Sequence, residues 1–292
     1  MSRGPVSAGH KLGQMVGEFF QEFFGDTLRA FAHNRKLYCD QKGPRPAVRG
    51  NKLKVTWIDS DGNAHDLDYV LEVGGSETKR GSPIAFIELA WRRYTKHSRN
   101  KTGEIEGALL HLRSTYSDTC RFLGTVLAGE FSGGGLQQLR SHGITILHIP
   151  FEKIAAAFQT REIDLDYPED ASDSVKWERI ARWNSLSAAD LKHIKRVLHK
   201  LIKSDMQEFI SVLDSALSRE VDSIRILSLF GEEMQCNSVE EGIDLLNRYK
   251  LSSGEMLEHY RFEIYIRFKN GDKIEGSFNT KEKALEFLSF YA

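Results

Sequence analysis

The chain has 292 residues, 40% of them hydrophobic, and a formal net charge of −1. This length allows one large domain or two smaller ones, and the charge lacks the basic excess of many dedicated polyanion binders. Three cysteines, far apart in sequence, fit neither a disulfide framework nor a zinc motif and favour a reducing compartment, predicted to be cytoplasmic. No stretch approaches the roughly 20 apolar residues that span a bilayer, so no membrane partner is expected.

A helix is predicted over residues 12–32, because apolar residues recur there at helical spacing and form one stripe. Glu18 and Glu22 lie four residues apart on another face. They are interpreted as solvated surface acids, with a contribution to a metal site as the alternative. The basic, turn-rich stretch over 42–50 is interpreted as an ordinary connecting loop rather than a phosphate contact.

Two strands follow, predicted over 52–58 and 66–73 and joined by an Asp-Gly-Asn turn signal. Side chains alternate along a strand with a period of two residues. Asp66, Asp68 and Glu72 are therefore expected to share one face of the second strand. Its apolar residues are expected on the other face.

A third strand is predicted over 84–91, where Glu88 is a charge inside an otherwise apolar segment. Burial of a lone carboxylate is costly unless a cation accompanies it. Asp68 and Glu88 on adjacent strands could hold a hard divalent ion through oxygen ligands. A basic segment without acidic residues follows and is expected to bind the nucleic-acid backbone through Arg92, Arg93, Lys96, Arg99 and Lys101.

The next elements alternate between helix and strand. They are a helix over 104–114, a strand over 121–128, a helix over 136–141, a strand over 144–149 and a helix over 151–158. This order predicts parallel pairing through a crossover. The glycines at 133–135 lack the spacing of a dinucleotide or P-loop motif and are interpreted as a helix entry. His148 is interpreted as a hydrogen-bonded core residue.

In these residues the chain resembles the PD-(D/E)XK, or restriction-endonuclease-like, nucleases, over roughly residues 8–158. That family has an N-terminal helix, a hairpin carrying an acid, a strand carrying the E-x-K pair, and then alternating helices and strands. Leu67 stands at the proline of the family name. Ala90 stands at the lysine of E-x-K.

The resemblance implies an α/β fold with a mixed sheet flanked by helices, and metal-dependent hydrolysis of phosphodiester bonds. Asp68 and Glu88 would be the metal ligands, and Mg²⁺ the ion. Either Lys96 or Lys101 would replace the missing lysine, or the site would be impaired. Glu104 falls where some restriction enzymes of the family carry an active-site acid on the helix.

The rest of the chain is expected to add two parts to a nuclease core over 1–170. A helical region is predicted over 171–250, with helices at 207–229 and 239–249. Residues 251–292 are predicted to form a β-hairpin followed by a helix, which could contact DNA or a second subunit. No internal repeat is apparent in the sequence.

The preferred function is a magnesium-dependent DNA endonuclease, most like a type II restriction enzyme. It would act on double-stranded DNA as a homodimer, because cutting both strands with one site per chain needs two copies. Three alternatives remain open. They are a repair or junction-cleaving nuclease of the same fold, a non-catalytic DNA-binding protein as Ala90 suggests, and a structural ion-pair network in another α/β domain.

Overall fold

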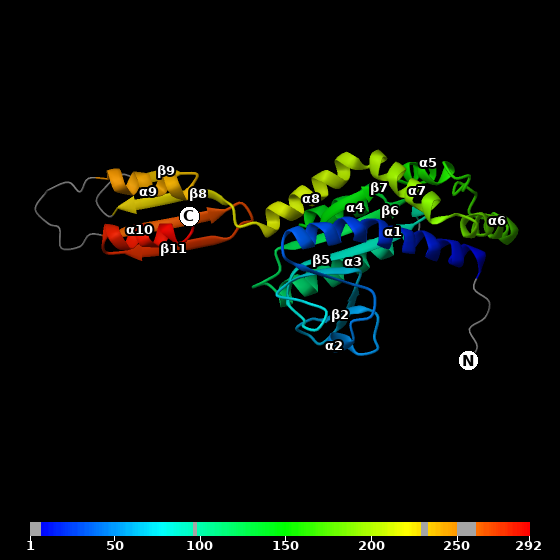
Figure 1. Cartoon of the computed structure of the whole chain (residues 1–292), viewed down its shortest axis with the longest axis horizontal. Coiled ribbons are helices and arrows are strands. Elements are labelled where there is room, and N and C mark those ends of the chain that lie inside the picture. The colour runs from blue at the N-terminus through cyan, green and yellow to red at the C-terminus, as the bar shows by residue number, and fades with distance from the viewer. Residues whose placement is uncertain (1–6, 96–97, 229–232, 250–260) are drawn as a thin grey trace, which may run out of the picture. The chain divides into compact units, whose positions relative to one another are not determined.

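The chain forms two units, each built on its own sheet, in a computed structural model that describes residues 7–95, 98–228, 233–249 and 261–292. The first unit spans Met1–Val212 and the second Leu213–Ala292. Figure 1 shows the helices and strands of both units.

A five-stranded sheet forms the centre of the first unit, with strands in the order β1-β4-β5-β6-β7. They are β1 (Tyr38–Gln41), β4 (Tyr69–Val73), β5 (Ser82–Arg92), β6 (Phe122–Gly129) and β7 (Thr145–Ile149). β1, β4 and β5 pair antiparallel, and β5, β6 and β7 pair parallel. The predicted mixed sheet of an α/β fold is therefore confirmed, including the parallel crossover connections.

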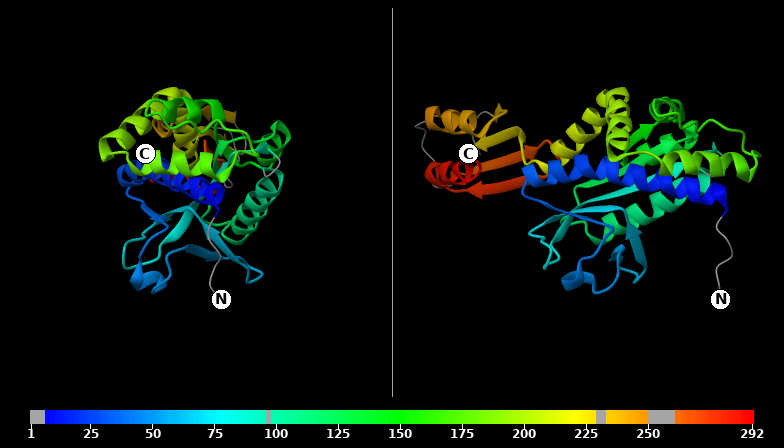
Figure 2. Two further views of the ribbon diagram at one scale, coloured as in Figure 1. Left: turned by 90° about the vertical axis from the view of Figure 1, so that its right-hand side faces the viewer. Right: turned by 45° about the vertical axis from the view of Figure 1, so that its right-hand side comes forward.

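Helices cover both faces of this sheet, as the two views in Figure 2 show. On one face α1 (Ala8–Asn34) packs Phe20 on Trp91 and Phe24 on Tyr69, and α5 (Phe151–Gln159) contacts β6. On the other face α3 (Ser98–Thr115) and α4 (Gly133–Ser141) enclose a core that includes Phe86. The side chain of Ser132 caps α4, so the glycines at 133–135 form a helix entry, as predicted.

The strand predicted over 66–73 is two strands, because the chain changes partners at Asp68. β3 (Ala64–Leu67) pairs with β2 (Val55–Ile58) in a separate hairpin, whereas β4 pairs with β1 and β5. Leu67 lies in the core on the α3 side, while Tyr69 contacts Phe24 of α1. Residues two apart share one face of a regular strand. The bend at Asp68 breaks this alternation, so Leu67 and Tyr69 point to opposite faces of the sheet.

Glu72 does not share an acidic face with Asp66 and Asp68, which corrects the sequence prediction. Its carboxylate is buried and accepts hydrogen bonds from the Arg45 guanidinium at 2.8 and 3.0 Å and from the Gly81 backbone N–H at 2.7 Å. Glu72 is therefore a structural residue.

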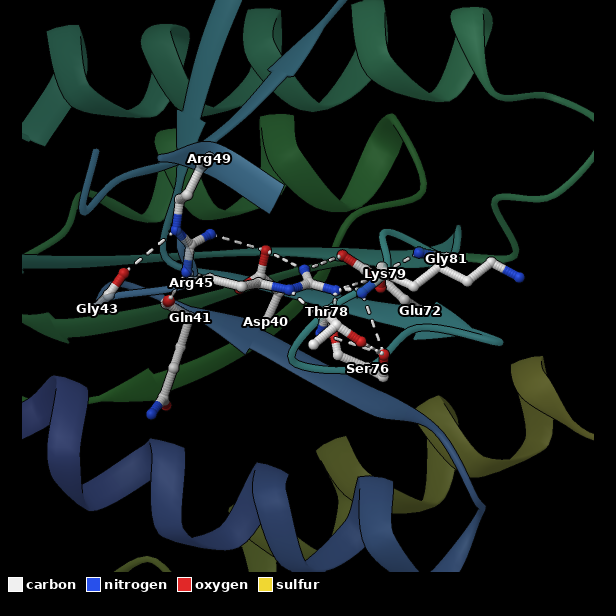
Figure 3. A network of polar contacts seen from close by, with 10 residues as sticks. All are labelled: Asp40, Gln41, Gly43, Arg45, Arg49, Glu72, Ser76, Thr78, Lys79 and Gly81. Carbon is white, nitrogen blue, oxygen red and sulfur yellow. Dashed lines mark hydrogen bonds and ion pairs between the residues drawn. The ribbon is translucent and has the colours of Figure 1, made fainter. Parts of the chain in front are cut away.

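Arg45 lies at the centre of a buried polar network that joins β1, β4 and the loop after β4 (Figure 3). Besides Glu72, it binds Asp40 of β1 at 2.8 Å and the backbone carbonyls of Ser76 and Lys79. Arg49, at the end of the short helix α2 (Pro46–Arg49), binds Asp40 from a second side. The basic stretch over 42–50 thus contributes two arginines to the scaffold.

Three further helices begin in the first unit: α6 (Asp173–Asn184), α7 (Ala188–Leu201) and α8 (Lys203–Leu217). α6 contacts α1, and α7 contacts α5. The predicted boundary near residue 170 therefore differs from the structure, because the helices beyond it pack on the first unit. No helix in the described part of the chain is long and apolar enough to cross a membrane.

The second unit contains a four-stranded sheet in the order β11-β10-β8-β9. Its elements are β8 (Val221–Ser228), β9 (Glu233–Cys236), α9 (Val239–Arg248), β10 (Phe262–Phe268), β11 (Lys273–Phe278) and α10 (Lys281–Ser289). The terminal hairpin and helix agree with the prediction. The helix predicted over 207–229 is wrong in its second half, where β8 pairs with β10.

Two copies of a hairpin-plus-helix motif make up this unit, although no repeat was apparent in the sequence. Ile224 and Ile226 correspond to Ile264 and Ile266, forty positions later, and all four are buried between sheet and helices. The N-caps of the two helices, Ser238 and Thr280, correspond as well, but at a spacing of 42. The change of spacing and the sparse identities conceal the repeat.

Candidate functional site

Asp68 and Glu88 come from different segments and meet in one cleft of the first unit. Asp68 occupies the bend between β3 and β4. Glu88 lies midway along β5, between two core residues of the α3 side, Phe86 and Ala90. The two carboxyl groups share a hydrogen bond. The structure thus brings together the two acids on which the predicted metal site depends.

Two amide groups hold the Asp68 carboxylate in place. The Leu89 backbone N–H donates to Oδ2 at 2.7 Å, and the Gln21 side-chain amide of α1 donates to Oδ1 at 2.7 Å. Donors to both oxygens fix the rotation of the carboxylate, so its remaining lone pairs have a defined direction.

The pKa values of both acids are raised. For Asp68 the cause is burial, which hydrogen bonds from Leu89 and Gln21 and the charge of Lys101 oppose. For Glu88 burial acts together with the negative charge of Asp68, so its pKa lies well above the ordinary value. The two carboxyl groups act on each other's pKa, and burial is the largest cause of the raised pKa at both.

Lys101 lies in the first turn of α3, and its positive charge lowers the pKa of both carboxyl groups. It lines the same cleft, and its side chain is 23% exposed. Ala90, at the family's lysine position, is 3% exposed and belongs to the core formed with α3. Ala90 also lines the cleft, but the lysine charge that acts on the acids comes from Lys101 of α3.

Of the other acids considered, Glu104 does not line the cleft of the acid pair, whereas Glu18 and Glu22 line a smaller pocket together with Asp68. Glu104 is exposed and forms an ion pair with Lys101 at 3.4 Å. Glu18 accepts a hydrogen bond from Gln14, and Glu22 pairs with Lys195 at 3.0 Å. Lys96 and the side chain of Arg99 fall outside the described part of the chain.

Arg92 and Arg93, both predicted to bind the nucleic-acid backbone, differ in their surroundings. Arg93 is engaged in the fold: it binds Asp166 at 2.9 Å and the Leu165 carbonyl, and its guanidinium lies over the Phe151 ring. Arg92 lines the cleft, and its one described hydrogen bond is to the Trp91 carbonyl at 2.8 Å. Arg92 is therefore the arginine available to a phosphate.

The cleft has a volume of about 630 Å³, large enough for a drug-sized ligand. The glycines Gly13 and Gly17 of α1 form part of one wall. Four cations line the cleft beside three acids, namely Lys42, Lys54, Arg92 and Lys101 against Asp66, Asp68 and Glu88. A bound divalent ion would make the cleft strongly positive, as a phosphate diester requires.

A second group of possible metal ligands in the described residues comprises Asp59, Asp61 and His111. The Asp59 carboxylate is already saturated: Oδ1 accepts the backbone N–H groups of Asp61 and Asn63, and Oδ2 is bonded to the Asn63 amide and to His65. This arrangement closes the β2–β3 turn, so we assign it a structural role.

Sequence reasoning missed Gln21 and Thr125. The helical stripe of α1 draws attention to Glu18 and Glu22, yet it is the amide between them that contacts Asp68. Thr125 of β6 pairs with Glu88 in register, and its buried hydroxyl has no hydrogen-bond partner among the described residues. A threonine beside the acid-bearing strand is a weak signal, because its neighbour becomes known only with the register.

No protein-family model matches the chain, and no curated protein matches it either. Among solved structures, the chain is similar to the crystal structure of AF1548, a protein of unknown function, with 10% sequence identity and a TM-score of 0.30. The alignment covers 65% of this chain and 98% of that one. The functional interpretation therefore depends on the geometry of the site itself.

Proposed function

We propose that the chain is a divalent-metal-dependent nuclease that hydrolyses phosphodiester bonds in DNA on a restriction-endonuclease-like core. The observation that carries this proposal is the hydrogen-bonded Asp68 and Glu88 pair, with Lys101 beside it, in a cleft open to ligand. Structural ion pairs place opposite charges together, as Arg45 does with Glu72. Two acids in direct contact are instead an arrangement that a cation stabilises.

The donor set suits a hard ion such as Mg²⁺. Asp68 and Glu88 offer only oxygen ligands. Among the described residues, no cysteine thiol and no histidine imidazole contacts them. Gln21 and the Leu89 N–H hold Asp68 from behind, as the groups that orient metal ligands do. When bound, the ion would screen the phosphate charge and activate a water molecule.

The protein's own groups would do the remaining work. Asp68 and Glu88 would hold the ion through their carboxylate oxygens, for which Glu88 would have to be ionised. Lys101 favours that ionised state of both acids and can donate to the phosphate or to the attacking water. Arg92 can hold a neighbouring phosphate in the same cleft.

A non-catalytic DNA-binding protein is the main alternative, and its support was the alanine at position 90. Lys101 weakens the argument from Ala90, because this lysine of α3 supplies a positive charge that acts on both carboxyl groups. The restriction-enzyme assignment further requires a homodimer that cuts both strands of double-stranded DNA. Double-strand breaks at defined positions are the expected product of that arrangement.

A cleavage assay tests the proposal. Purified chain would be incubated with plasmid and with single-stranded circular DNA, in Mg²⁺ or in chelator. We expect cleavage in Mg²⁺ that is lost in Asp68→Asn and Glu88→Gln. Asp61→Asn is the matched control, since Asp61 is an exposed turn aspartate outside the cleft. Cleavage by the two cleft variants, or none by the wild-type chain with any divalent ion, contradicts the proposal.

A further inference from the structure

The cleft that holds Asp68 and Glu88 continues into a second cleft of about 660 Å³. The two clefts share part of their lining, including Gly13 of α1, Trp91 and Arg92 at the end of β5, and Lys101 of α3. They therefore form one groove, which runs along α1 from the acid pair past the end of β5.

The second cleft combines aromatic rings with charges of both signs. Its lining includes four cations and two acids, namely Arg92, Arg93, Lys101 and Lys176 with Glu104 and Glu169. Tyr94 and Tyr167 line it, and the Tyr94 hydroxyl donates to the Tyr167 backbone carbonyl at 3.4 Å. Lys176 of α6 adds a cation next to those shared with the first cleft. Aromatic side chains next to a cationic track are the combination that binds single-stranded nucleic acid, with bases stacking on the rings and phosphates following the cations.

Three glycines form part of the α1 wall of this groove, alongside larger residues such as His10 and Gln14. Gly9, Gly13 and Gly17 are spaced four residues apart and so share one face of the helix, which lines the groove. A Cβ added at Gly13 or Gly17 would meet no protein atom within 4 Å. Helix glycines are less stable than alanine, and packing within the protein does not require them here. They leave room for a ligand backbone to approach the helix closely.

The depth of the acid pair restricts what can reach it. Glu88 is 7% exposed, at the floor of the first cleft. Each cleft has the volume of a site for one small molecule, which corresponds to one or two nucleotides. An unpaired strand can enter a groove of this size. A base-paired strand cannot, because its complementary strand would have to enter with it.

We propose that this groove binds one unpaired strand, so that the substrate of the nuclease is single-stranded, frayed or forked DNA at the point of cleavage. This inference rests on the proposed nuclease function, and it replaces the double-stranded substrate of the restriction-enzyme assignment with an unpaired strand. The scissile phosphate lies at Asp68 and Glu88, and the backbone follows the glycine face of α1. A nearby base stacks on the face of the Tyr94 ring opposite Arg93, whose guanidinium lies 4.9 Å from the ring centroid.

Matched oligonucleotides test the substrate class. A single strand, a splayed fork and a full duplex of the same sequence would be compared in Mg²⁺ for cleavage. Binding would be measured in Ca²⁺ with the Asp68→Asn chain. We expect the single strand and the fork to be cut and bound at least tenfold better than the duplex. Tyr94→Ala should weaken single-strand binding about tenfold, and Tyr94→Phe should largely preserve it, because stacking needs only the ring.

Alanine substitutions in two helices provide the matched structural control. Gly13→Ala with Gly17→Ala should raise the melting temperature and weaken single-strand binding and cleavage at least fivefold. Gly103→Ala with Gly107→Ala, on α3 and outside both clefts, should raise the melting temperature without changing either. A purely structural role for the α1 glycines predicts the same result for both pairs.

The outcomes separate this inference from the proposed function. Equal cleavage of duplex and single strand, with silent Tyr94 and glycine variants, overturns the inference while the nuclease stands. Single-strand binding that depends on Tyr94, without cleavage in any divalent ion, overturns the hydrolytic function and leaves the strand-binding groove. Absence of any DNA binding overturns both.

Discussion

Burial and the charge of Asp68 raise the pKa of Glu88, so its surroundings favour the protonated form. A group whose pKa is higher in the folded chain than in the unfolded chain makes its full contribution to stability below its unfolded-state pKa. That contribution is lost as the pH rises through its folded-state pKa. The ion-free chain is therefore less stable near neutral pH than it would be with a neutral side chain at position 88.

Glu88→Gln should consequently raise the unfolding temperature of the ion-free chain at pH 8 and change it less at pH 4, close to the pKa of an unfolded glutamate. Thermal unfolding in chelator at the two pH values measures this. A variant that is destabilised equally at both would mean that the carboxylate serves the fold rather than an ion.

Lys101 lowers the pKa of both acids by its charge. Lys101→Met should reduce cleavage about 100-fold, within the range for removal of a group that assists proton transfer. The acidic limb of the pH–rate profile should also move to higher pH, because the carboxyl groups would ionise less readily. Lys101→Arg should restore the limb. An unchanged profile in Lys101→Met would remove Lys101 from the site.

For single residues, the sequence predicts which acids form the site but not which other side chains contact those acids. Asp68 and Glu88 follow from the position of carboxylates within predicted strands. Lys101 lies on α3 because that helix begins at Ser98 rather than near 104, while Lys96 falls outside the described residues. Gln21 contacts Asp68 from 47 positions away, and no local pattern indicates such a contact.

At the scale of elements, β1, β4 and the loop between β4 and β5 depend on the buried Arg45. Removing one partner of a buried ion network leaves charges without compensation, which typically costs about 3–5 kcal/mol. Arg45→Met should lower the free energy of unfolding by about that amount in urea denaturation. Lys52→Met, at an exposed position, should change it by less than about 0.5 kcal/mol. A near-neutral Arg45→Met would contradict this account.

The misassigned elements have identifiable physical causes. The segment 66–73 alternates as one strand would, but burial of Leu67 and Tyr69 on opposite faces of the sheet is a tertiary effect. Near 207–229, the helical spacing of α8 runs almost directly into the alternating residues of β8, because only three residues separate the two elements. The short β1 was missed, since four residues with a buried Asp40 do not resemble a strand.

At the scale of the whole molecule, the fold class and the order of the first unit follow from the sequence, whereas the division into units does not. The second unit has its own core, which contains Ile264 with no exposed surface. Ile264→Ala should lower its stability by about 2–5 kcal/mol. Hydrogen exchange should then accelerate in β8 and β10 but not in α1 or β5. Acceleration in β5 would show that the two cores unfold together.

The central claim is that Asp68 and Glu88 hold one divalent ion, and calorimetric titration with Mn²⁺ tests it most directly. The wild-type chain should bind one ion with release of a proton, since Glu88 must ionise. Glu88→Gln should lose this binding, and Asp61→Asn should retain it. Binding that survives in Glu88→Gln but disappears in Asp61→Asn would place the metal at the β2–β3 turn and contradict the account.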